Sequence, residues 1–385
     1  MKKILLAQDT IDKNDFDRLI EWLKIYPRLT KGEKTIEFET QWAKAVGSKY
    51  AVFVNSGSSA NLLMLYSLIT ANRLKNDKIV VPALSWITDI SPVIQFGLLP
   101  VLVDCNNKNL SVDIKQLQFI FETQQPAALL LVSILGLVPD MDEIVALCKK
   151  YGVLLLIDNC EGLGSKHKGN NLETYGLMAS CSTYYGHIIS TIEGGMITTD
   201  DEELYNTLKM LRSHGWDRDL SHEKKQEIRT KHNISGFNSL YTFYTTGFNV
   251  RSTDLSAYIG IGQLDKLDAI VKKRNENYLL YKKQLNDNIW KPQEKEGDFV
   301  SNLGYPVISQ HREKIVNKLI ENNVEVRPLV SGSMGCQPFF TGLWGYKQIF
   351  TQSDIIDHEG FYVPNHPMLT EDDIKLICNI INETK

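Results

Sequence analysis

The sequence predicts an α/β protein in which a large domain with a mostly parallel sheet is followed by a smaller α+β domain. Three observations lead to this prediction. Short aliphatic runs alternate with amphipathic segments through the first two-thirds of the chain, a pattern typical of parallel sheets covered by helices on both faces. The pattern changes after about residue 290. The length of 385 residues is sufficient for two domains.

The first domain is expected to contain buried strands joined by helices. The predicted strands are the apolar runs 50–54, 78–82, 99–104, 127–133 and 153–158. Between them, segments such as 59–74 and 141–152 carry apolar residues at helical spacing. Ligands of such sheets bind at the carboxyl ends of the strands, so the residues that follow these runs are the candidates for a site.

The segment 217–246 interrupts this alternation, because it is first polar and then aromatic. We expect it to be an excursion over the surface that reaches a partner subunit. Helical periodicity returns over 254–285, and strands at 304–308 and 324–327 with helices at 311–322 and 371–383 follow. We predict a large domain over 1–264 and a small domain over 265–385.

Composition excludes several classes of protein. The chain is 43% hydrophobic and 23% charged with a net charge of −4, which gives no reason to expect nucleic acid or anionic lipid as a partner. No stretch approaches the roughly 18 apolar residues of a membrane span, and the apolar run in "MKKILLAQDT" is too short for a signal peptide. A cytoplasmic protein is expected. The scattered cysteines form no C-x-x-C pair and predict reduced structural thiols and no metal site; they are Cys105, Cys148, Cys160, Cys181, Cys336 and Cys378.

Two motifs combine a strand end with residues suited to an anion or a ring. "NSGSSAN" (55–61) follows a strand and opens a helix, and the small residues Gly57 and Ser58 there suit a phosphate, although a plain capped turn has the same composition. "PALSWITD" (82–89) places Trp86 after the next strand. This indole could stack on a planar ring or lie in the core.

Two further motifs bring titratable groups. In "IDNCEGLG" (157–164), Asp158 ends a very apolar strand and could hold a protonated pyridine nitrogen, or else cap a helix. Glu161 could reach the same ligand. In "STYYGHIISTIEGGM" (182–196), Ser182 offers a phosphate ligand and His187 lies before a pair of glycines. A lone histidine is more often structural than catalytic.

In this order the motifs resemble the fold-type I, aspartate-aminotransferase-like enzymes that use pyridoxal phosphate, and more narrowly the DegT/DnrJ/EryC1/StrS family. The resemblance runs from "ETQWAKAVGSKYAVFVNSGSSANLLM" through "GFNVRSTDLSAYIGIGQL" to "VEVRPLVSG". It implies a mostly parallel seven-stranded sheet in the large domain. It also implies a homodimer with shared active sites, because Asn249 of "GFNVR" is expected to reach the cofactor phosphate of the neighbouring subunit.

The resemblance also implies roles for the other candidates. Gly57, Ser58 and Ser182 would hold the cofactor phosphate. Asp158 would hold the pyridine nitrogen, Glu161 would lie by the ring hydroxyl, and Trp86 would stack on the ring. The candidates for binding glutamate or a sugar nucleotide are His214, Arg251 and Arg327.

One departure from the family pattern decides the expected reaction. His187 stands where the family's aminotransferases have a lysine, six residues before Glu193 of "EGG". An imidazole cannot form the covalent link that lysine makes with the cofactor aldehyde, but it can move protons near neutral pH. This replacement marks the family's sugar 3-dehydratases. The scattered cysteines do not suit the branch that couples to an iron–sulfur cluster.

The resemblance therefore implies a lyase with non-covalently held pyridoxal or pyridoxamine phosphate and glutamate as amino donor. It would remove the C3 hydroxyl of a GDP-linked 4-keto-6-deoxy sugar and give a 4-keto-3,6-dideoxy sugar, ammonia and 2-oxoglutarate. Such a product belongs to dideoxysugar biosynthesis for lipopolysaccharide or capsule. The alternatives are a 4-aminotransferase of a nucleotide sugar, close to perosamine-type synthases, and a non-catalytic relative that binds cofactor or nucleotide sugar. Whether the sugar is a hexose or a heptose is left open.

Overall fold

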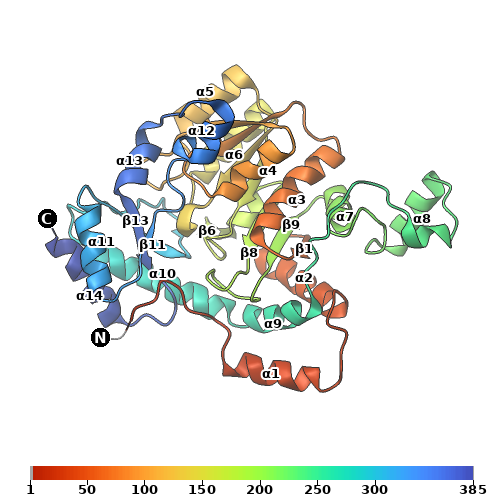
Figure 1. Ribbon diagram of the computed structural model, residues 1–385, viewed down its shortest axis with the longest axis horizontal. Coiled ribbons are helices and arrows are strands. Elements are labelled where there is room, and N and C mark those ends of the chain that lie inside the picture. The colour runs from red at the N-terminus through yellow and green to blue at the C-terminus, as the bar shows by residue number, and fades with distance from the viewer. Residues whose placement is uncertain (1–2, 385) are drawn as a thin grey trace.

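A seven-stranded sheet forms the centre of the computed structural model, which describes residues 3–384 (Figure 1). Its strand order is β1-β9-β8-β5-β4-β2-β3, and β9 alone runs antiparallel to its neighbours. The strands are β1 (Tyr50–Val54), β2 (Lys78–Pro82), β3 (Leu99–Val103), β4 (Ala128–Val132), β5 (Leu154–Asp158), β8 (Met178–Ser182) and β9 (Gly195–Thr199). The prediction of a mostly parallel sheet is confirmed.

Helices cover both faces of this sheet, because successive side chains of each strand point to opposite sides. In β4, Ala128 and Leu130 join the apolar cluster under α3, α4 and α7, whereas Leu129 and Leu131 join the cluster under α5 and α6. The helices of this part are α2 (Glu33–Val46), α3 (Gly57–Thr70), α4 (Ile87–Gln95), α5 (Ile114–Gln124), α6 (Met141–Tyr151), α7 (Glu202–Leu211) and α9 (Asp254–Leu264).

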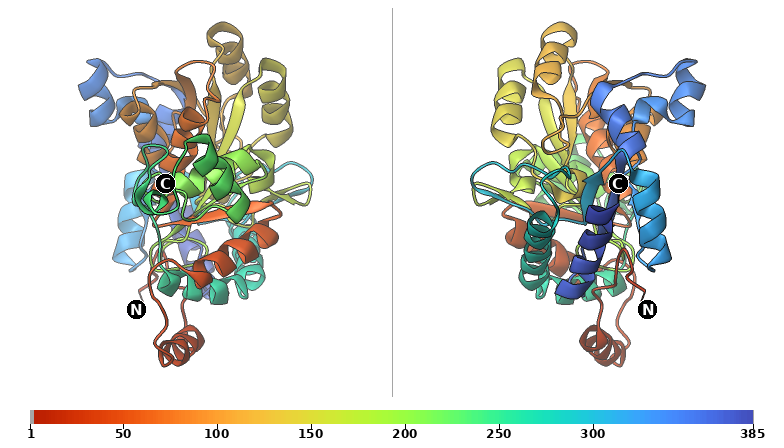
Figure 2. Two further views of the ribbon diagram at one scale, coloured as in Figure 1. Left: turned by 90° about the vertical axis from the view of Figure 1, so that its right-hand side faces the viewer. Right: turned by 90° about the vertical axis from the view of Figure 1, so that its left-hand side faces the viewer.

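Two segments extend away from this body. Helix α1 (Lys13–Leu23) hangs below it, and the predicted excursion, with α8 (His222–Lys231) and the short helix η3 (Asn238–Tyr241), projects to the right in Figure 1. Helix α1 also stands clear of the body in both side views of Figure 2. Helix α8 buries none of its residues. The prediction of a surface excursion is confirmed, and its contact with a partner stays a prediction.

The C-terminal part begins with the long helix α10 (Leu267–Gln284), which runs along the base of the molecule (Figure 1). A small antiparallel sheet follows, with β13 between β11 and β12. Its elements are β11 (Gly304–Ile308), α11 (Arg312–Glu321), β12 (Arg327–Pro328), α12 (Pro338–Trp344), α13 (Thr351–Glu359), β13 (Gly360–Pro364) and α14 (Glu371–Glu383). The proposed boundary between residues 264 and 265 falls between α9 and α10 and stays a prediction.

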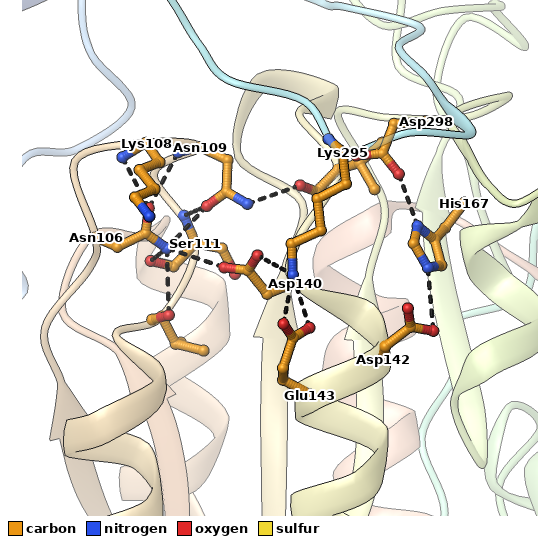
Figure 3. A network of polar contacts seen from close by, with 12 residues as sticks. Asn106, Lys108, Asn109, Ser111, Asp140, Asp142, Glu143, His167, Lys295 and Asp298 are labelled. Carbon is orange, nitrogen blue, oxygen red and sulfur yellow. Dashed lines mark hydrogen bonds and ion pairs between the residues drawn. The ribbon is translucent and has the colours of Figure 1, made fainter.

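A polar network attaches the segment after α10 to the start of helix α6 (Figure 3). The buried His167 lies between two carboxylates, with Nδ1 2.6 Å from Asp298 Oδ1 and Nε2 3.2 Å from Asp142 Oδ1. Lys295 Nζ lies 2.7 Å from both Asp140 Oδ1 and Glu143 Oε1. Asp140, Asp142 and Glu143 lie just before or on the first turn of α6. The network therefore holds a small three-stranded sheet against α6. Its strands are β6 (Lys166–His167), β7 (Asn170–Asn171) and β10 (Asp298–Phe299).

The described residues contain no helix that could span a membrane. All six cysteines are unpaired. No group of three or more His, Cys, Asp or Glu side chains in residues 3–384 is arranged to hold a metal ion.

Candidate active site

The carboxyl ends of β5 and β8 and the first turn of α3 meet at one edge of the sheet. Gly57 begins α3, whose N-cap Ser56 accepts a hydrogen bond from Ser59 N–H. A Cβ atom added at Gly57 would lie 2.8 Å from both Cys160 Sγ and Ser182 Cβ, so only glycine allows this approach. Gly195 of β9 is equally close, since an added Cβ would lie 2.2 Å from Ser56 O. The exposed amides of a helix start beside Ser182 form a cradle that suits a phosphate.

Asp158 is the buried carboxylate of this edge. Its Oδ1 accepts a hydrogen bond from Cys160 N–H at 2.8 Å, and its Oδ2 accepts one from Asn61 Nδ2 at 2.5 Å. Asn61 is itself held, because its Oδ1 accepts a hydrogen bond from Ser180 Oγ at 2.6 Å. A carboxylate offers about four lone-pair sites, so Asp158 retains acceptor capacity for a cationic N–H.

A second buried carboxyl group, Asp89, completes this network. Its Oδ1 accepts a hydrogen bond from Asn61 Nδ2 at 3.1 Å and its Oδ2 accepts one from Trp86 N–H at 3.1 Å. Burial, followed by the nearby charge of Asp158, raises the pKa of Asp89 well above its usual range. Of the two carboxyl groups, Asp89 is therefore the one whose surroundings favour the neutral form.

His187 has a defined tautomer. Its Nδ1 lies 2.6 Å from the carbonyl oxygen of Cys160, and a carbonyl can only accept, so the proton is on Nδ1. The lone pair of the neutral ring is therefore on Nε2. Burial lowers the pKa of His187, although the Cys160 carbonyl and the Asp158 charge oppose this effect. The imidazole of His187 is therefore favoured in its neutral form near pH 7.

Glu161 follows Cys160 in the chain, and burial shifts the pKa of its carboxyl group. Its Oε2 accepts a hydrogen bond from Leu135 N–H at 2.6 Å. Burial raises the pKa of Glu161 to about 7, against the effect of that hydrogen bond. Leu135 holds its amide toward Glu161 from a left-handed backbone conformation with φ of 50°, which non-glycine residues adopt at some energetic cost.

Trp86 caps the N-terminus of α4 and is 51% exposed. Its backbone N–H is fixed by Asp89, whereas its ring stacks on no other ring in the described chain. An indole held at its backbone and free at its face can cover a planar ring.

Three further predicted residues, His214, Asn249 and Arg251, lie on segments that pack together, and Arg251 forms a backbone bridge with Val54 at the end of β1. His214 and Trp216 contact each other edge to face with ring centroids 5.1 Å apart, and Asn249 Oδ1 accepts a hydrogen bond from Arg251 Nε at 3.0 Å. The Arg251 guanidinium lies 5.9 Å from the centre of the Trp216 ring. Asn249 is exposed and pairs with the backbone of Ser213. Within residues 3–384 no hydrogen bond joins these side chains to Asp158 or His187, but Asn55 N–H donates to Val250 O at 3.0 Å, so the segment lies against the end of β1.

Arg327 is exposed on β12 and lines a surface cavity of about 440 Å³ together with Arg312. It is linked to the edge of the sheet through Tyr362, whose pKa is raised to about 12 by burial and, to a smaller extent, by Glu161, while Arg327 lowers it.

The structure thus brings six of the predicted residues together around one edge of the sheet. They are Gly57, Trp86, Asp158, Glu161, Ser182 and His187. Ser58 is exposed on the first turn of α3. Sequence reasoning missed Asn61, Asp89 and Ser180, although the first two stand in quoted motifs. The roles of all these residues stay predictions.

A phosphorylated pyridine fits these residues. The start of α3 has the close approach that an anion needs, Asp158 has acceptor capacity for an N–H⁺, Glu161 has a buried carboxyl group, and Trp86 has an exposed ring. The donor set has no covalent anchor, because no lysine takes part in the hydrogen bonds of Asp158, Glu161 or His187 in residues 3–384.

Comparison with known proteins agrees with this fit. The chain is 34% identical, over the full length of both proteins, to a GDP-4-keto-6-deoxy-D-mannose 3-dehydratase of Yersinia pseudotuberculosis. It superposes with a TM-score of 0.90 and 32% identity on a mutant GDP-4-keto-6-deoxymannose-3-dehydratase with bound GDP-perosamine, covering 99% of this chain and 100% of that one. It superposes with a TM-score of 0.87 and 33% identity on a crystal structure of GDP-4-keto-6-deoxymannose-3-dehydratase with a trapped adduct of pyridoxal phosphate and glutamate, covering 97% and 99%.

The family model that matches describes the DegT/DnrJ/EryC1/StrS aminotransferases, and it matches residues 9–382. Since the match spans nearly the whole chain, the fold and the family agree with the resemblance of the motifs. This chain belongs to the DegT/DnrJ/EryC1/StrS aminotransferase family.

Proposed function

We propose that this protein is a glutamate-dependent sugar 3-dehydratase with pyridoxal or pyridoxamine phosphate as cofactor. The substrate is a GDP-linked 4-keto-6-deoxy sugar, and the product is the 4-keto-3,6-dideoxy sugar. Glutamate leaves as 2-oxoglutarate and its nitrogen as ammonia. The observation that carries the proposal is His187, a neutral base with a free Nε2 in place of a lysine. The names of the relatives that are 34% identical support the choice of sugar.

The residues of the edge would divide the binding of the cofactor. The start of α3 with Ser182 would bind the phosphate, Asp158 the ring nitrogen and Glu161 the ring hydroxyl, under the indole of Trp86. When bound, the cofactor supplies an amine for the C4 ketone of the sugar and an electron sink beside it. A neutral, protonated Glu161 can donate to an oxygen, whereas Asp158 can only accept. The two carboxyl groups are therefore not interchangeable.

His187 would perform both proton transfers of the dehydration. Nε2 can accept a proton from the carbon that bears the amine, and the resulting imidazolium can give it to the C3 hydroxyl, which then leaves as water. The Nδ1–H bond to Cys160 O is kept in both protonation states, so the ring does not need to reorient. The lowered pKa favours the neutral base at the start and makes the imidazolium a stronger acid afterwards.

We further propose that the working unit is a homodimer. His214, Arg251 and Arg327 would bind the diphosphate of the sugar nucleotide or the carboxylate of glutamate. The forked guanidinium groups of the two arginines suit both of these anions. Asn249 is exposed, so its side chain is available to a neighbouring subunit. The exposed side chains of Phe237 and Tyr241, 82% and 74% accessible, offer apolar surface to such a partner.

The six unpaired thiols are typical of a reducing compartment. We therefore place the enzyme in the cytoplasm.

The test is mass spectrometry of the products formed from GDP-4-keto-6-deoxymannose, pyridoxal phosphate and ¹⁵N-glutamate. Loss of one oxygen from the sugar with release of ¹⁵N-ammonia is expected. A sugar that gains ¹⁵N would instead establish an aminotransferase. Unchanged sugar with 2-oxoglutarate formed would exclude this hexose and direct the search to another sugar nucleotide, such as a heptose.

A further inference from the structure

Arg274 is a buried cation without a carboxylate partner. It lies in α10, is 1% exposed, and forms no ion pair within residues 3–384. Its guanidinium instead donates to backbone carbonyls: Nη1 to Asn302 O at 3.3 Å, to Leu303 O at 3.0 Å and to Asn365 O. Burial lowers the pKa of Arg274 to about 9, so the side chain remains charged at neutral pH. Burying a charge without an opposite charge beside it costs free energy, so the position of Arg274 needs a functional or structural explanation.

The fourth contact of this guanidinium reaches the candidate base. Nη2 of Arg274 donates to the backbone carbonyl of His187 at 3.2 Å. The imidazole of the same residue is fixed from the other side by Cys160 O. Backbone and side chain of His187 are therefore held by two different parts of the chain.

The other contacts lead to Glu161. Two of the four residues whose carbonyls accept from Arg274 also donate to Leu135 O, Asn302 through Nδ2 at 2.8 Å and Leu303 through its backbone N–H at 2.9 Å. Leu135 N–H in turn donates to Glu161 Oε2 at 2.6 Å. Hydrogen bonds through Arg274, Asn302 and Leu303 thus connect the backbone of His187 with the Leu135 turn, whose N–H binds the Glu161 carboxyl group.

We propose that Arg274 is a positioning residue, which holds the His187 loop and the Leu135 turn at a fixed separation and opposes positive charge on the His187 imidazole. The inference builds on the proposed function. Two charges act on that imidazole: Asp158 favours its protonated form and Arg274 disfavours it. Loss of Arg274 should therefore make His187 easier to protonate and less well placed.

The first test needs no cofactor. NMR of ¹³C-histidine-labelled protein follows the titration of His187, whose signal is identified by its absence in His187→Asn. In Arg274→Gln the His187 midpoint is expected to rise by about 0.5 pH unit or more. The control is Lys272→Gln, which removes one positive charge from an exposed position on the same helix and should leave the midpoint unchanged. An unchanged midpoint in Arg274→Gln would overturn the electrostatic role.

The second test is kinetic. In Arg274→Gln, kcat for dehydration should fall about 10- to 100-fold with KM for the sugar nearly constant, and the acid limb of the kcat profile should move to higher pH. Arg274→Lys keeps the charge but not the fork, so its acid limb should stay in place while kcat falls. If Arg274→Gln does not fold, Arg274→Lys provides the test. A kcat of Arg274→Lys equal to that of the wild type would refute the proposal that Arg274 positions His187. If the wild-type enzyme does not dehydrate the sugar, the proposed function fails, and the NMR comparison still judges Arg274.

Discussion

The edge of the sheet around Asp158 and the protruding segment 217–246 differ in how many contacts their side chains make within the chain. At the edge, Asp158, Glu161 and His187 each have a hydrogen-bond partner from the same chain. On the excursion, α8 buries no residue and Phe237 is 82% exposed. The edge is therefore preorganised within one chain, whereas the excursion has apolar surface that its own chain leaves open.

The largest effect is expected at the edge, from His187→Asn. An asparagine amide can still donate to Cys160 O but has no basic nitrogen, so kcat should fall about 1,000-fold. Turnover measured by release of ammonia tests this. The exposed His232, at the C-cap of α8, provides the control His232→Asn, for which near-normal turnover is expected. A His187→Asn enzyme with more than a tenth of wild-type turnover would show that another residue is the base.

A smaller effect should distinguish the two carboxyl groups of the Asn61 network. Asp158→Asn removes a charge that the ring nitrogen needs, so affinity for pyridoxamine phosphate should fall about 10- to 100-fold. Asp89→Asn replaces a carboxyl group whose pKa burial raises and should change affinity less than about 3-fold, because less charge is lost there. Fluorescence titration of the cofactor measures both. Equal losses in the two variants would contradict the assignment of the charge to Asp158.

The excursion is tested by a matched pair of substitutions. Phe237→Asp should weaken a homodimer at least about 10-fold, because a buried, unpaired carboxylate at an interface costs more than about 1.4 kcal/mol. Phe119→Asp makes the same change on α5 at a side chain that is 63% exposed and should leave the dimer intact. Sedimentation velocity over a range of concentrations compares them. A Phe237→Asp dimer as stable as that of the wild type would show that the excursion is not part of the interface.

The smallest effect concerns stability and pH. In the native protein burial raises the pKa of Glu161 to about 7 from a usual value of 4.5, so its contribution to stability is complete below pH 4.5 and is lost as pH rises through 7. Between pH 6 and 8 the wild type should lose about 1.4 kcal/mol relative to Glu161→Gln. Urea unfolding of the cofactor-free proteins measures the difference. Glu173, with a pKa also raised to about 7 by burial, is common to both proteins and cancels. A constant difference would mean that Glu161 does not titrate there.

Much of the fold could be predicted from local patterns. The run 50–54 is β1 and the run 371–383 is α14, residue for residue, because aliphatic runs and capped amphipathic helices carry their signal locally. The predicted strand at 324–327 was less accurate: Val324 forms an isolated bridge with Ile4, and β12 is only Arg327–Pro328. That pairing depends on a distant N-terminal residue.

The site was predictable only in part, because some of its contacts also depend on residues that are distant in the sequence. Residues that follow strand ends, such as Asp158 and Ser182, are brought together by the topology of the sheet, which a sequence can indicate. Asn61 and Arg274 lie inside helices and act through contacts with residues 97 and 87 positions away. Nothing in "VKKRNEN" distinguishes Arg274 from its solvent-exposed basic neighbours, because its burial results from tertiary packing alone.

One apolar cluster contains Leu129 and Leu131 of the large sheet together with Tyr305 of β11 and Ile377 of α14. Since neither part has a separate core on that side, the chain should melt in a single calorimetric transition whose calorimetric and van't Hoff enthalpies agree. The C-terminal third is then no transplantable module: expressed alone it would expose half of a core. Changes in sugar specificity should therefore be reached through individual side chains around an indivisible body, and not through exchange of whole domains.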